Sequence, residues 1–249
     1  MTREDVCWRA EEACLNAFPS WREMIVEGWL LRASGGPTRR TNSVNPVRDR
    51  HPDSTTLIER CESIYSILGQ RPIFRMPSIA SEMDTILAER GYRMEAETCT
   101  LFAEFFYGTA FPAGNTVIKS KIWRGWLEAQ SRFAGSDALS SRIYGETLKA
   151  IIPETAFAAG NESGDVAAVA YGVLDGKLLV IESVATDPNH RGKGLAARCV
   201  GSLMNWAASK GAWGAVLQVM ADNTPALRLY RKLGFATELY RYHYRVKSL

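Results

Sequence analysis

The feature that most restricts the fold is a strand, a basic glycine-containing loop and a helix in unbroken succession. An apolar run over 178–184 predicts the strand, and the periodic run 195–210 predicts the helix. Amides at the start of such a helix have no partner within it, and the helix dipole favours an anion there. Gly192 and Gly194 have no side chains to hold an anion away from these amides. The segment therefore predicts a phosphate-binding loop.

The loop carries a pattern more specific than its glycine content. The Walker A pattern is absent, and so is the dinucleotide pattern G-x-G-x-x-G, because Ala197 stands where its third glycine would be. The loop instead reads Arg191-x-x-Gly194-x-Ala196, which resembles the Q/R-x-x-G-x-G/A signature of the GNAT superfamily of acyl-CoA-dependent N-acyltransferases. In that superfamily the loop amides bind the pyrophosphate of coenzyme A. The loop alone leaves an ordinary strand–turn–helix open as the alternative.

A second segment strengthens this resemblance. A short apolar strand ends at Asn223, a good helix N-cap, and Gly234 ends the helix that follows. The spacing Asn223-x-x-Ala226-x-x-Leu229-Tyr230-x-x-x-Gly234-Phe235 resembles the second GNAT signature. The two patterns stand in the order of the superfamily, with Gly194 and Asn223 29 residues apart, and together they are more specific than either alone. The resemblance covers roughly residues 117–249.

The resemblance implies acetyl-CoA as the cofactor. In the superfamily, the strand before the loop hydrogen-bonds the pantetheine through its backbone, and the asparagine lies close to the pantetheine. The residues expected to contact coenzyme A are Val184, Ala185, Thr186, Arg191, Gly192, Lys193, Gly194, Leu195, Ala196, Asn223 and Tyr230.

The implied reaction is direct attack of a primary amine on an acyl thioester, and two residues are candidates for its proton transfers. In the superfamily the tyrosine often protonates the departing thiolate, which assigns Tyr230 as the general acid. An acidic residue is frequent on the strand before the loop, which makes Glu182 the candidate base for the ammonium. The alternatives are aromatic core packing for Tyr230 and an ion pair with an arginine for Glu182.

Composition limits the other classes of function. A chain of 249 residues with 46% hydrophobic content suffices for one large domain or two smaller ones, and no apolar run approaches the roughly 20 residues of a membrane span. The N-terminus carries no apolar signal segment. The five cysteines are an odd number without close pairing, which is typical of buried thiols in a reducing compartment. No Cys/His cluster has metal-ligand spacing. We therefore expect a cytoplasmic protein without a membrane or metal site.

Charge is distributed unevenly along the chain. Residues 1–115 contain 13 basic and 16 acidic residues, a net charge of −3, whereas residues 116–249 contain 17 basic and 11 acidic residues, a net charge of +6. The half with the phosphate loop is thus the basic half, which suits a polyanionic cofactor. There is no basic run of five or more residues, so we expect no nucleic-acid partner.

The two halves of the chain resemble each other with an offset near 143 residues. Phe74 and Gly91 are 17 residues apart, as are Leu217 and Gly234, and each pair spans a predicted strand and helix. A tandem arrangement of this kind is known in the GNAT superfamily. We therefore expect a GNAT-like N-terminal lobe over 1–110 and a GNAT domain over 116–249, joined by a Gly/Pro-bearing stretch. An unrelated α+β lid is the alternative for the first lobe.

The earlier copy differs from the later one where the chemistry would occur. It has no loop glycines, and Asp49 and Asp53 would repel a pyrophosphate there. Leu87 stands at the position that matches Tyr230. We therefore expect the N-terminal lobe to be degenerate and to bind no coenzyme A.

Several side chains are candidates for the acceptor site, although core packing or a solvated turn explains them as well. The aromatic candidates are Trp123, Trp126, Phe133, Trp206 and Trp213, and the polar candidates are Arg39, Arg40 and Asn42.

The predicted fold is α+β, with a mixed and mostly antiparallel sheet in each lobe. Strands 178–186 and 214–220 are separated by a helix, which predicts a parallel pair; in the superfamily this pair splays apart around the pantetheine. The other predicted helices are 3–17, 54–68, 80–90, 122–133, 139–151, 194–210 and 224–233, and the other predicted strands are 24–33, 41–46, 72–76, 93–105, 116–120, 154–161, 165–174 and 236–246.

The leading hypothesis is an acetyl-CoA-dependent N-acetyltransferase that acts on a primary amine of a small molecule or peptide. A non-catalytic acyl-CoA-binding sensor or regulatory module is the alternative. Two lobes in one chain can imitate a dimer, so we expect either a monomer or a homodimer.

Overall fold

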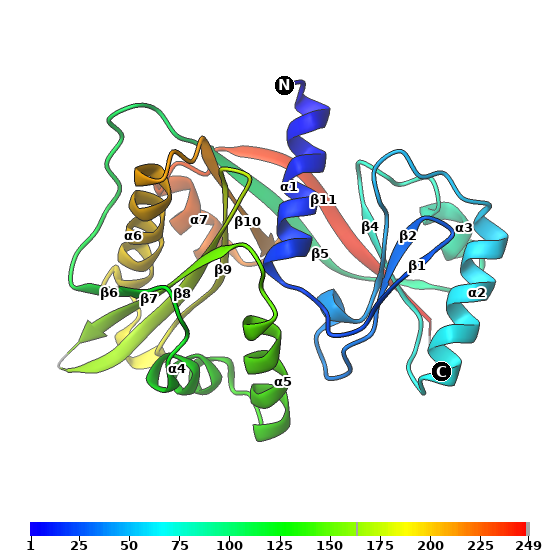
Figure 1. Ribbon diagram of the computed structural model, residues 1–249, viewed down its shortest axis with the longest axis horizontal. Helices are drawn as coiled ribbons and strands as arrows, with labels where there is room; N and C mark the ends of the chain where they lie inside the picture. Colours follow the sequence, from blue (N-terminus) through cyan, green and yellow to red (C-terminus); the bar gives the residue numbers. More distant parts are fainter. Residues whose placement is uncertain (163, 248–249) are drawn as a thin grey trace.

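The computed structural model describes residues 1–162 and 164–247, which form one mixed sheet with helices packed on it (Figure 1). The first half contains α1 (Arg3–Ala17), β1 (Glu23–Val26), β2 (Trp29–Arg32), η1 (Arg39–Thr41), β3 (Val44–Asn45), α2 (Ser54–Ile67), β4 (Ile73–Pro77), α3 (Asp84–Glu89) and β5 (Arg93–Glu104). The second half contains β6 (Thr116–Lys119), α4 (Arg124–Ala134), α5 (Ala138–Lys149), β7 (Glu154–Glu162), β8 (Asp165–Asp175), β9 (Leu178–Thr186), η2 (Pro188–His190), α6 (Leu195–Ser209), β10 (Gly214–Met220), α7 (Thr224–Lys232) and β11 (Thr237–Val246). The sheet contains parallel and antiparallel pairs, which confirms the predicted α+β class.

Most predicted elements agree with the observed ones within two residues, and three do not. The predicted strand 24–33 is wrong, because Glu27 and Gly28 adopt φ values of 49° and 85° and turn the segment into the β1–β2 hairpin. The predicted strand 41–46 contributes only the two residues of β3, after the short helix η1. The predicted helix 80–90 begins only at Asp84, because a turn with a hydrogen bond from the Ala80 amide to the Pro77 carbonyl precedes it.

The two halves of the chain exchange strands at the centre of the sheet. The strand order is β1-β2-β3-β4-β11-β5-β10-β9-β8-β7-β6. β5 comes from the first half and pairs with β10, whereas β11 comes from the second half and pairs with β4; β5 and β11 pair with each other. Outward from this central pair, β4 and β10 hold matching places, and so do β3 and β9. The sheet therefore runs through both halves without a break.

The predicted parallel pair of β9 and β10 is confirmed, and it is short. Residues 214–217 of β10 pair with residues 178–181 of β9. Both strands continue beyond this point, β9 to Thr186 and β10 to Met220, without pairing to each other. The two strands therefore part at the end that leads into the glycine loop.

A β-bulge in β9 accompanies this parting. The pairing of β9 with β8 shifts register between Val169 and Tyr171, and Ser183 in the bulge has a left-handed φ of 51°. The Ser183 Oγ accepts a hydrogen bond of 2.7 Å from the Tyr144 hydroxyl on α5. Because a bulge bends its strand and strengthens the local twist, it directs the end of β9 away from β10.

Helices cover the two faces of the sheet in the second half of the chain. α4 and α5 pack on one face, and α6 and α7 pack on the other. α1 belongs to the first half of the sequence but packs against β8, β9, β10 and β11, in front of the central strands in Figure 1. A third apolar core forms between α2, α3 and strands β1 to β4. No helix in the described part of the chain is long and apolar enough to cross a membrane.

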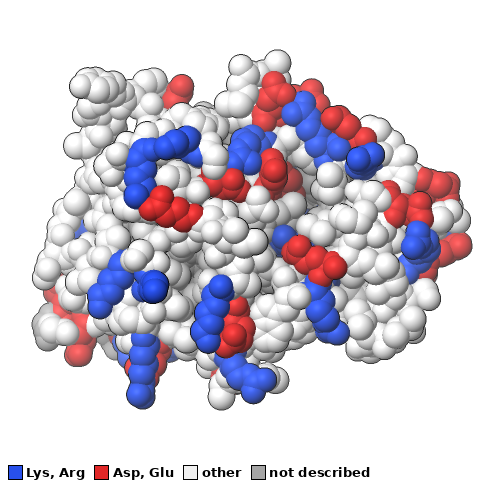
Figure 2. Space-filling view, in the orientation of Figure 1, with Lys and Arg blue, Asp and Glu red and all other residues white. Residues whose placement is uncertain are grey.

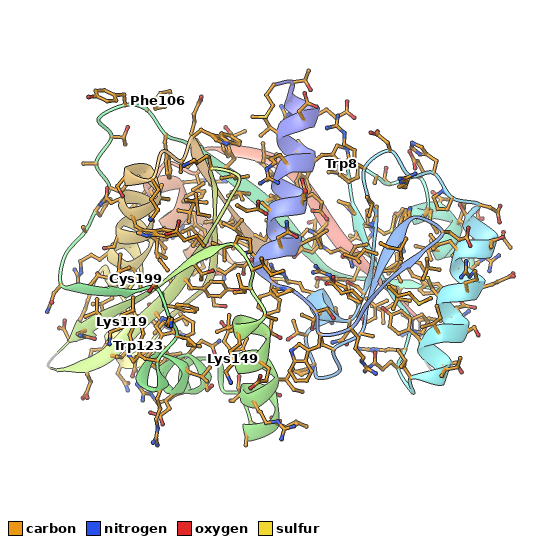
Figure 3. All side chains as sticks on the ribbon, viewed as in Figure 1. Trp8, Phe106, Lys119, Trp123, Lys149 and Cys199 are labelled. Carbon is orange, nitrogen blue, oxygen red and sulfur yellow. The ribbon has the colours of Figure 1, made fainter. Side chains whose placement is uncertain are left out.

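The segment between β5 and β6 lies along α6. The Asn205 side chain hydrogen-bonds both the amide and the carbonyl of Phe111, each at 3.0 Å. A Cβ at Gly201 would lie 1.9 Å from the Pro112 carbonyl oxygen, so only glycine permits this approach. Phe106, at the start of the segment, points outward at the corner of the molecule (Figure 3). The division of the chain into two lobes at this segment stays a prediction.

A buried ion pair connects α1 to the sheet. Glu11 on α1 accepts a hydrogen bond from Arg75 on β4 and another, of 2.6 Å, from the Tyr240 hydroxyl on β11. The Arg75 guanidinium also lies 3.7 Å from the centre of the Tyr242 ring. The side chains of Glu11 and Arg75 are 1% and 3% exposed. The pair thus joins three elements from both halves of the chain.

Removal of Glu11 is expected to destabilise the protein strongly. Glu11→Ala leaves the Arg75 charge buried without its partner, and we expect it to lower the free energy of unfolding by about 3–5 kcal/mol in urea denaturation. Glu12→Ala is the matched control, because the Glu12 side chain is 65% exposed and pairs with Arg9 at the surface. The control is expected to cost less than about 1 kcal/mol. Equal losses in the two variants would contradict the role given to the buried pair.

Candidate active site

A cleft of about 720 Å³ opens where β9 and β10 part. The end of β9, the glycine loop, the first turn of α6 and the inner face of α7 form its walls. It is lined by Phe133, Val184, Ala185, Thr186, His190, Arg191, Gly192, Gly194, Leu195, Ala196, Ala197, Asn223, Pro225, Ala226, Arg228, Leu229, Tyr230 and Lys232. The structure therefore brings together nearly all of the residues that the sequence predicts for coenzyme A.

The glycine loop has the geometry of an anion cradle. Gly192 and Gly194 have φ values of +79° and +73°, and a Cβ on Gly192 would meet nothing within 4 Å. Gly194 is the N-cap of α6 and supplies no side-chain oxygen to the first amides of the helix. These amides therefore face the cleft as free donors at the positive end of the helix dipole. The loop fits a diphosphate.

The corresponding helix of the first half is closed to an anion. Asp53 is the N-cap of α2, and its carboxylate accepts a 2.8 Å hydrogen bond from the Thr56 amide. This bond lowers the pKa of Asp53, so a negative charge already stands at the helix start. Leu87, which matches Tyr230 in the repeat, is fully buried in the core.

Two of the predicted residues lie outside the cleft lining. Lys193 directs its Nζ to the Glu162 carboxylate at 3.2 Å, because the side chain leaves the loop on the side of β7. Glu182 precedes the bulge in β9 and lies on the opposite face of the sheet, under α1.

Glu182 takes part in a second buried ion pair. Its two carboxylate oxygens accept hydrogen bonds of 2.8 and 2.5 Å from Arg40, a residue 142 positions earlier in the chain. The side chains are 22% and 7% exposed for Arg40 and Glu182, and the Arg40 guanidinium lies 4.6 Å from the centre of the Phe18 ring. Burial lowers the pKa of Arg40, but Glu182 raises it well above its ordinary value. This geometry matches the ion pair that the sequence left open as the alternative role of Glu182.

Asn223 and Tyr230 contribute to the cleft from opposite ends of α7. The Asn223 side chain caps the helix by accepting a hydrogen bond of 3.2 Å from the Ala226 amide. The Tyr230 ring packs edge-on against Phe235, and the residue is 7% exposed. Burial, and to a lesser extent Glu182, raise the pKa of Tyr230 well above its ordinary value. Tyr230 therefore keeps its proton at neutral pH and can donate it.

The cleft also contains residues that the sequence did not predict. His190 precedes the loop, and Phe133, an acceptor-site candidate from the sequence, enters from α4. Arg228 and Lys232 come from α7, four residues apart. The helical spacing from Asn223 through Pro225 and Leu229 to Lys232 could have identified the face of α7 that lines the cleft.

The other acceptor candidates have partners elsewhere. Arg39 pairs with Glu95 at 2.5 Å, and the Asn42 side chain holds the backbone of its own loop. Trp126 is fully buried and donates to the Ala158 carbonyl. Lys119 lies 4.8 Å above the Trp123 ring (Figure 3). Of the five aromatic candidates, only Phe133 lines the cleft.

The other reactive side chains among the described residues form no second site. All five cysteines are free and buried, and Cys199 on α6 faces the sheet (Figure 3). Within residues 1–162 and 164–247, no group of three His, Cys, Asp or Glu side chains could hold a metal ion. On the face drawn in Figure 2, basic and acidic side chains are interspersed and form no continuous basic stripe.

Comparison with known structures identifies the fold. A GCN5-related N-acetyltransferase from Kribbella flavida superimposes with a TM-score of 0.73 at 17% identity, over 98% of this chain and 96% of that one. A tandem GNAT protein from the clavulanic acid biosynthesis pathway superimposes with a TM-score of 0.62 at 11% identity, over 78% of this chain and 69% of that one. The chain therefore has the fold of these GNAT proteins.

Sequence comparison identifies the family. Residues 8–245 match the family described as "Probable histone acetyltransferase Rv0428c C-terminal", and the chain belongs to this family. The uncharacterized N-acetyltransferase YobR of Bacillus subtilis is 26% identical over 246 residues, 96% of this chain and 98% of that protein. A streptothricin acetyltransferase of Streptomyces lavendulae is 36% identical over 83 residues, 32% of this chain and 43% of that protein. Acyl transfer is thus the activity of the class.

Paired substitutions can test the coupling of Arg40 and Glu182. Arg40→Met and Glu182→Met each leave one buried charge unpaired, so each is expected to lower the free energy of unfolding by about 3–5 kcal/mol. The double variant is expected to lose less than either single variant, because it buries no charge. Urea denaturation of the four proteins measures the coupling. Additive losses would contradict a direct pair.

Proposed function

We propose that the chain is an acetyl-CoA-dependent N-acetyltransferase that acetylates a primary amine of a small molecule or peptide. The observation that carries the proposal is the cleft at the parted strands. It combines a glycine cradle at a helix start, a protonated tyrosine and an asparagine cap in one continuous space of about 720 Å³. Bound acetyl-CoA would supply the activated acetyl thioester.

Different residues of the cleft bind the cofactor, position the reactants and transfer a proton. The free amides of the α6 first turn and Arg191 bind the diphosphate. The edge of β9 at Val184–Thr186 that no longer pairs with β10 would hydrogen-bond the pantetheine, as a neighbouring strand would. Tyr230 retains its proton in the cleft and would donate it to the leaving thiolate. Holding both reactants in line supplies a large part of the acceleration.

Glu182 is a candidate for two roles, the general base of the reaction and a positioning residue. As the base, it would accept the proton of the incoming ammonium, directly or through water. Its two oxygens are occupied by Arg40, which supports a positioning role at the junction of the two halves. The Arg40→Met/Glu182→Met double variant separates these roles, because it has neither the carboxylate nor an unpaired charge. Retained turnover in that variant would exclude Glu182 as the base.

We also propose that the two halves are a degenerate and a working copy of one lobe. The matching order of strands on either side of β5 and β11 supports this reading, and so does the self-capped start of α2. The five buried free thiols favour a reducing, cytoplasmic location. A monomer would then already have the shape of a dimer.

A panel of amines tests the activity. The protein is incubated with acetyl-CoA and amino acids, polyamines, aminoglycosides or short peptides, and free thiol is measured. Thiol release with at least one amine, together with the acetylated product by mass spectrometry, is the expected result. Binding of acetyl-CoA without thiol release from any amine would favour the sensor instead.

Tyr230→Phe is expected to lower turnover with the best amine by about ten- to a hundredfold, because general acid catalysis contributes on this scale. The ring keeps its packing against Phe235, so the dissociation constant of coenzyme A should change little. Calorimetry and steady-state kinetics give the two values. Unchanged turnover would remove Tyr230 from the proton transfer.

Gly194→Asp tests the cradle. It places a carboxylate at the start of α6 and should abolish the thermal stabilisation by coenzyme A. Gly211→Asp is the matched control, because Gly211 has a similar φ of +78° at the other end of the same helix. The control suffers the same backbone strain but keeps the cradle, so coenzyme A should still stabilise it. Equal stabilisation of both variants would refute the assignment of the loop.

A further inference from the structure

The charges that line the cleft are all of one sign. Arg191, Arg228 and Lys232 line it, and no acidic residue of the described part does. Lys193 is paired with Glu162, whereas the ion pairs found among the described residues include none of these three cations. The cleft thus has three positively charged side chains available to a ligand.

These cations stand on two different walls. Arg191 belongs to the glycine loop, next to the free amides of α6. Arg228 and Lys232 lie four residues apart on α7, so they are neighbours on one face of the helix. That face includes Leu229 and Pro225, which also line the cleft. Arg231 does not line it; with Arg241, which has the larger effect, it lowers the pKa of the Glu238 carboxyl.

A bound diphosphate would use the positive groups of only one of these two walls. The helix start, the loop amides and Arg191 already supply the donors that a diphosphate needs. Arg228 and Lys232 add two cations that no protein carboxylate neutralises within the described chain. An anion held by the loop would leave both available to a further phosphate on the same ligand.

We propose that Arg228 and Lys232 form a subsite for the phosphate on the ribose 3′-hydroxyl of coenzyme A, and that they select coenzyme A over its dephosphorylated form. The inference rests on the proposed function, since it concerns the same cleft. It goes beyond it by assigning the third phosphate of the ligand to the face of α7.

The proposal predicts a defined loss of affinity. Coenzyme A and dephospho-coenzyme A differ only in the 3′-phosphate, so their ratio of dissociation constants isolates the subsite. We expect the unaltered protein to bind coenzyme A at least about tenfold more tightly, a difference of about 1.4 kcal/mol. The preference should decrease as salt increases, because the two side chains are exposed to solvent.

Isothermal titration calorimetry with both ligands tests the subsite without any acceptor. Arg228→Gln and Lys232→Gln should each weaken the binding of coenzyme A and leave that of dephospho-coenzyme A nearly unchanged. Arg231→Gln is the matched control: it removes the same charge from the same helix and should keep the preference. Thermal unfolding of each variant without ligand confirms that the fold is intact.

Each outcome of the calorimetry either supports or overturns the proposal. A preference lost in both cleft variants and kept in the control supports the subsite. Equal binding of the two ligands to the unaltered protein overturns it, and so do variants that weaken both ligands equally. In these cases the proposed function stands, because coenzyme A still binds. Failure of both ligands to bind overturns the proposed function, and the subsite with it.

Discussion

The parting of β9 and β10 is the constraint on which the site depends. Four residue pairs join the two strands in parallel, and the bulge at Ser183 then directs β9 away. Tyr144 fixes the bulge from α5 by its hydrogen bond to Ser183. A continuous ladder would close the cleft and pair residues 184–186 with β10 as well as with β8. The break in pairing leaves the β10-facing edge of these residues free, and it brings α6 and α7 to the two sides of the same opening.

The region under α1 differs from the open cleft, because its buried charged side chains form ion pairs with one another. Glu182 pairs with Arg40 of the other half, and Glu11 pairs with Arg75 while it also accepts a hydrogen bond from Tyr240 on β11, so both ion pairs connect the two halves. Arg32 adds to this junction by donating to the carbonyls of Leu15 and Phe18 at the end of α1. Apolar packing alone would tolerate small shifts between the halves. Directional ion pairs favour one arrangement, and this arrangement sets the position of Glu182 beside the bulge.

Local signals in the sequence were sufficient for the elements around the cleft. The glycines at 192 and 194 and the cap at Asn223 act within a few residues, so the loop, α6 and α7 could be predicted. The partner of Glu182 could not, because Arg40 is 142 residues away and nothing local marks the contact. The β1–β2 hairpin was missed because Glu27, an unusual residue for a left-handed turn, forms it. A repeat also cannot indicate which copy of a strand pairs with which, so the exchange of β5 and β11 appeared only in the structure.

That exchange has a consequence for how the chain is made. β5 emerges from the ribosome before both of its neighbours, β10 and β11. One edge of β4 also stays unpaired until β11 has been synthesised. A nascent chain of the first half therefore has open strand edges that its own residues cannot cover. Such edges invite pairing with other chains. Folding of the first half is thus tied to synthesis of the second, and a pause in translation between them would prolong the time during which these strand edges are unpaired.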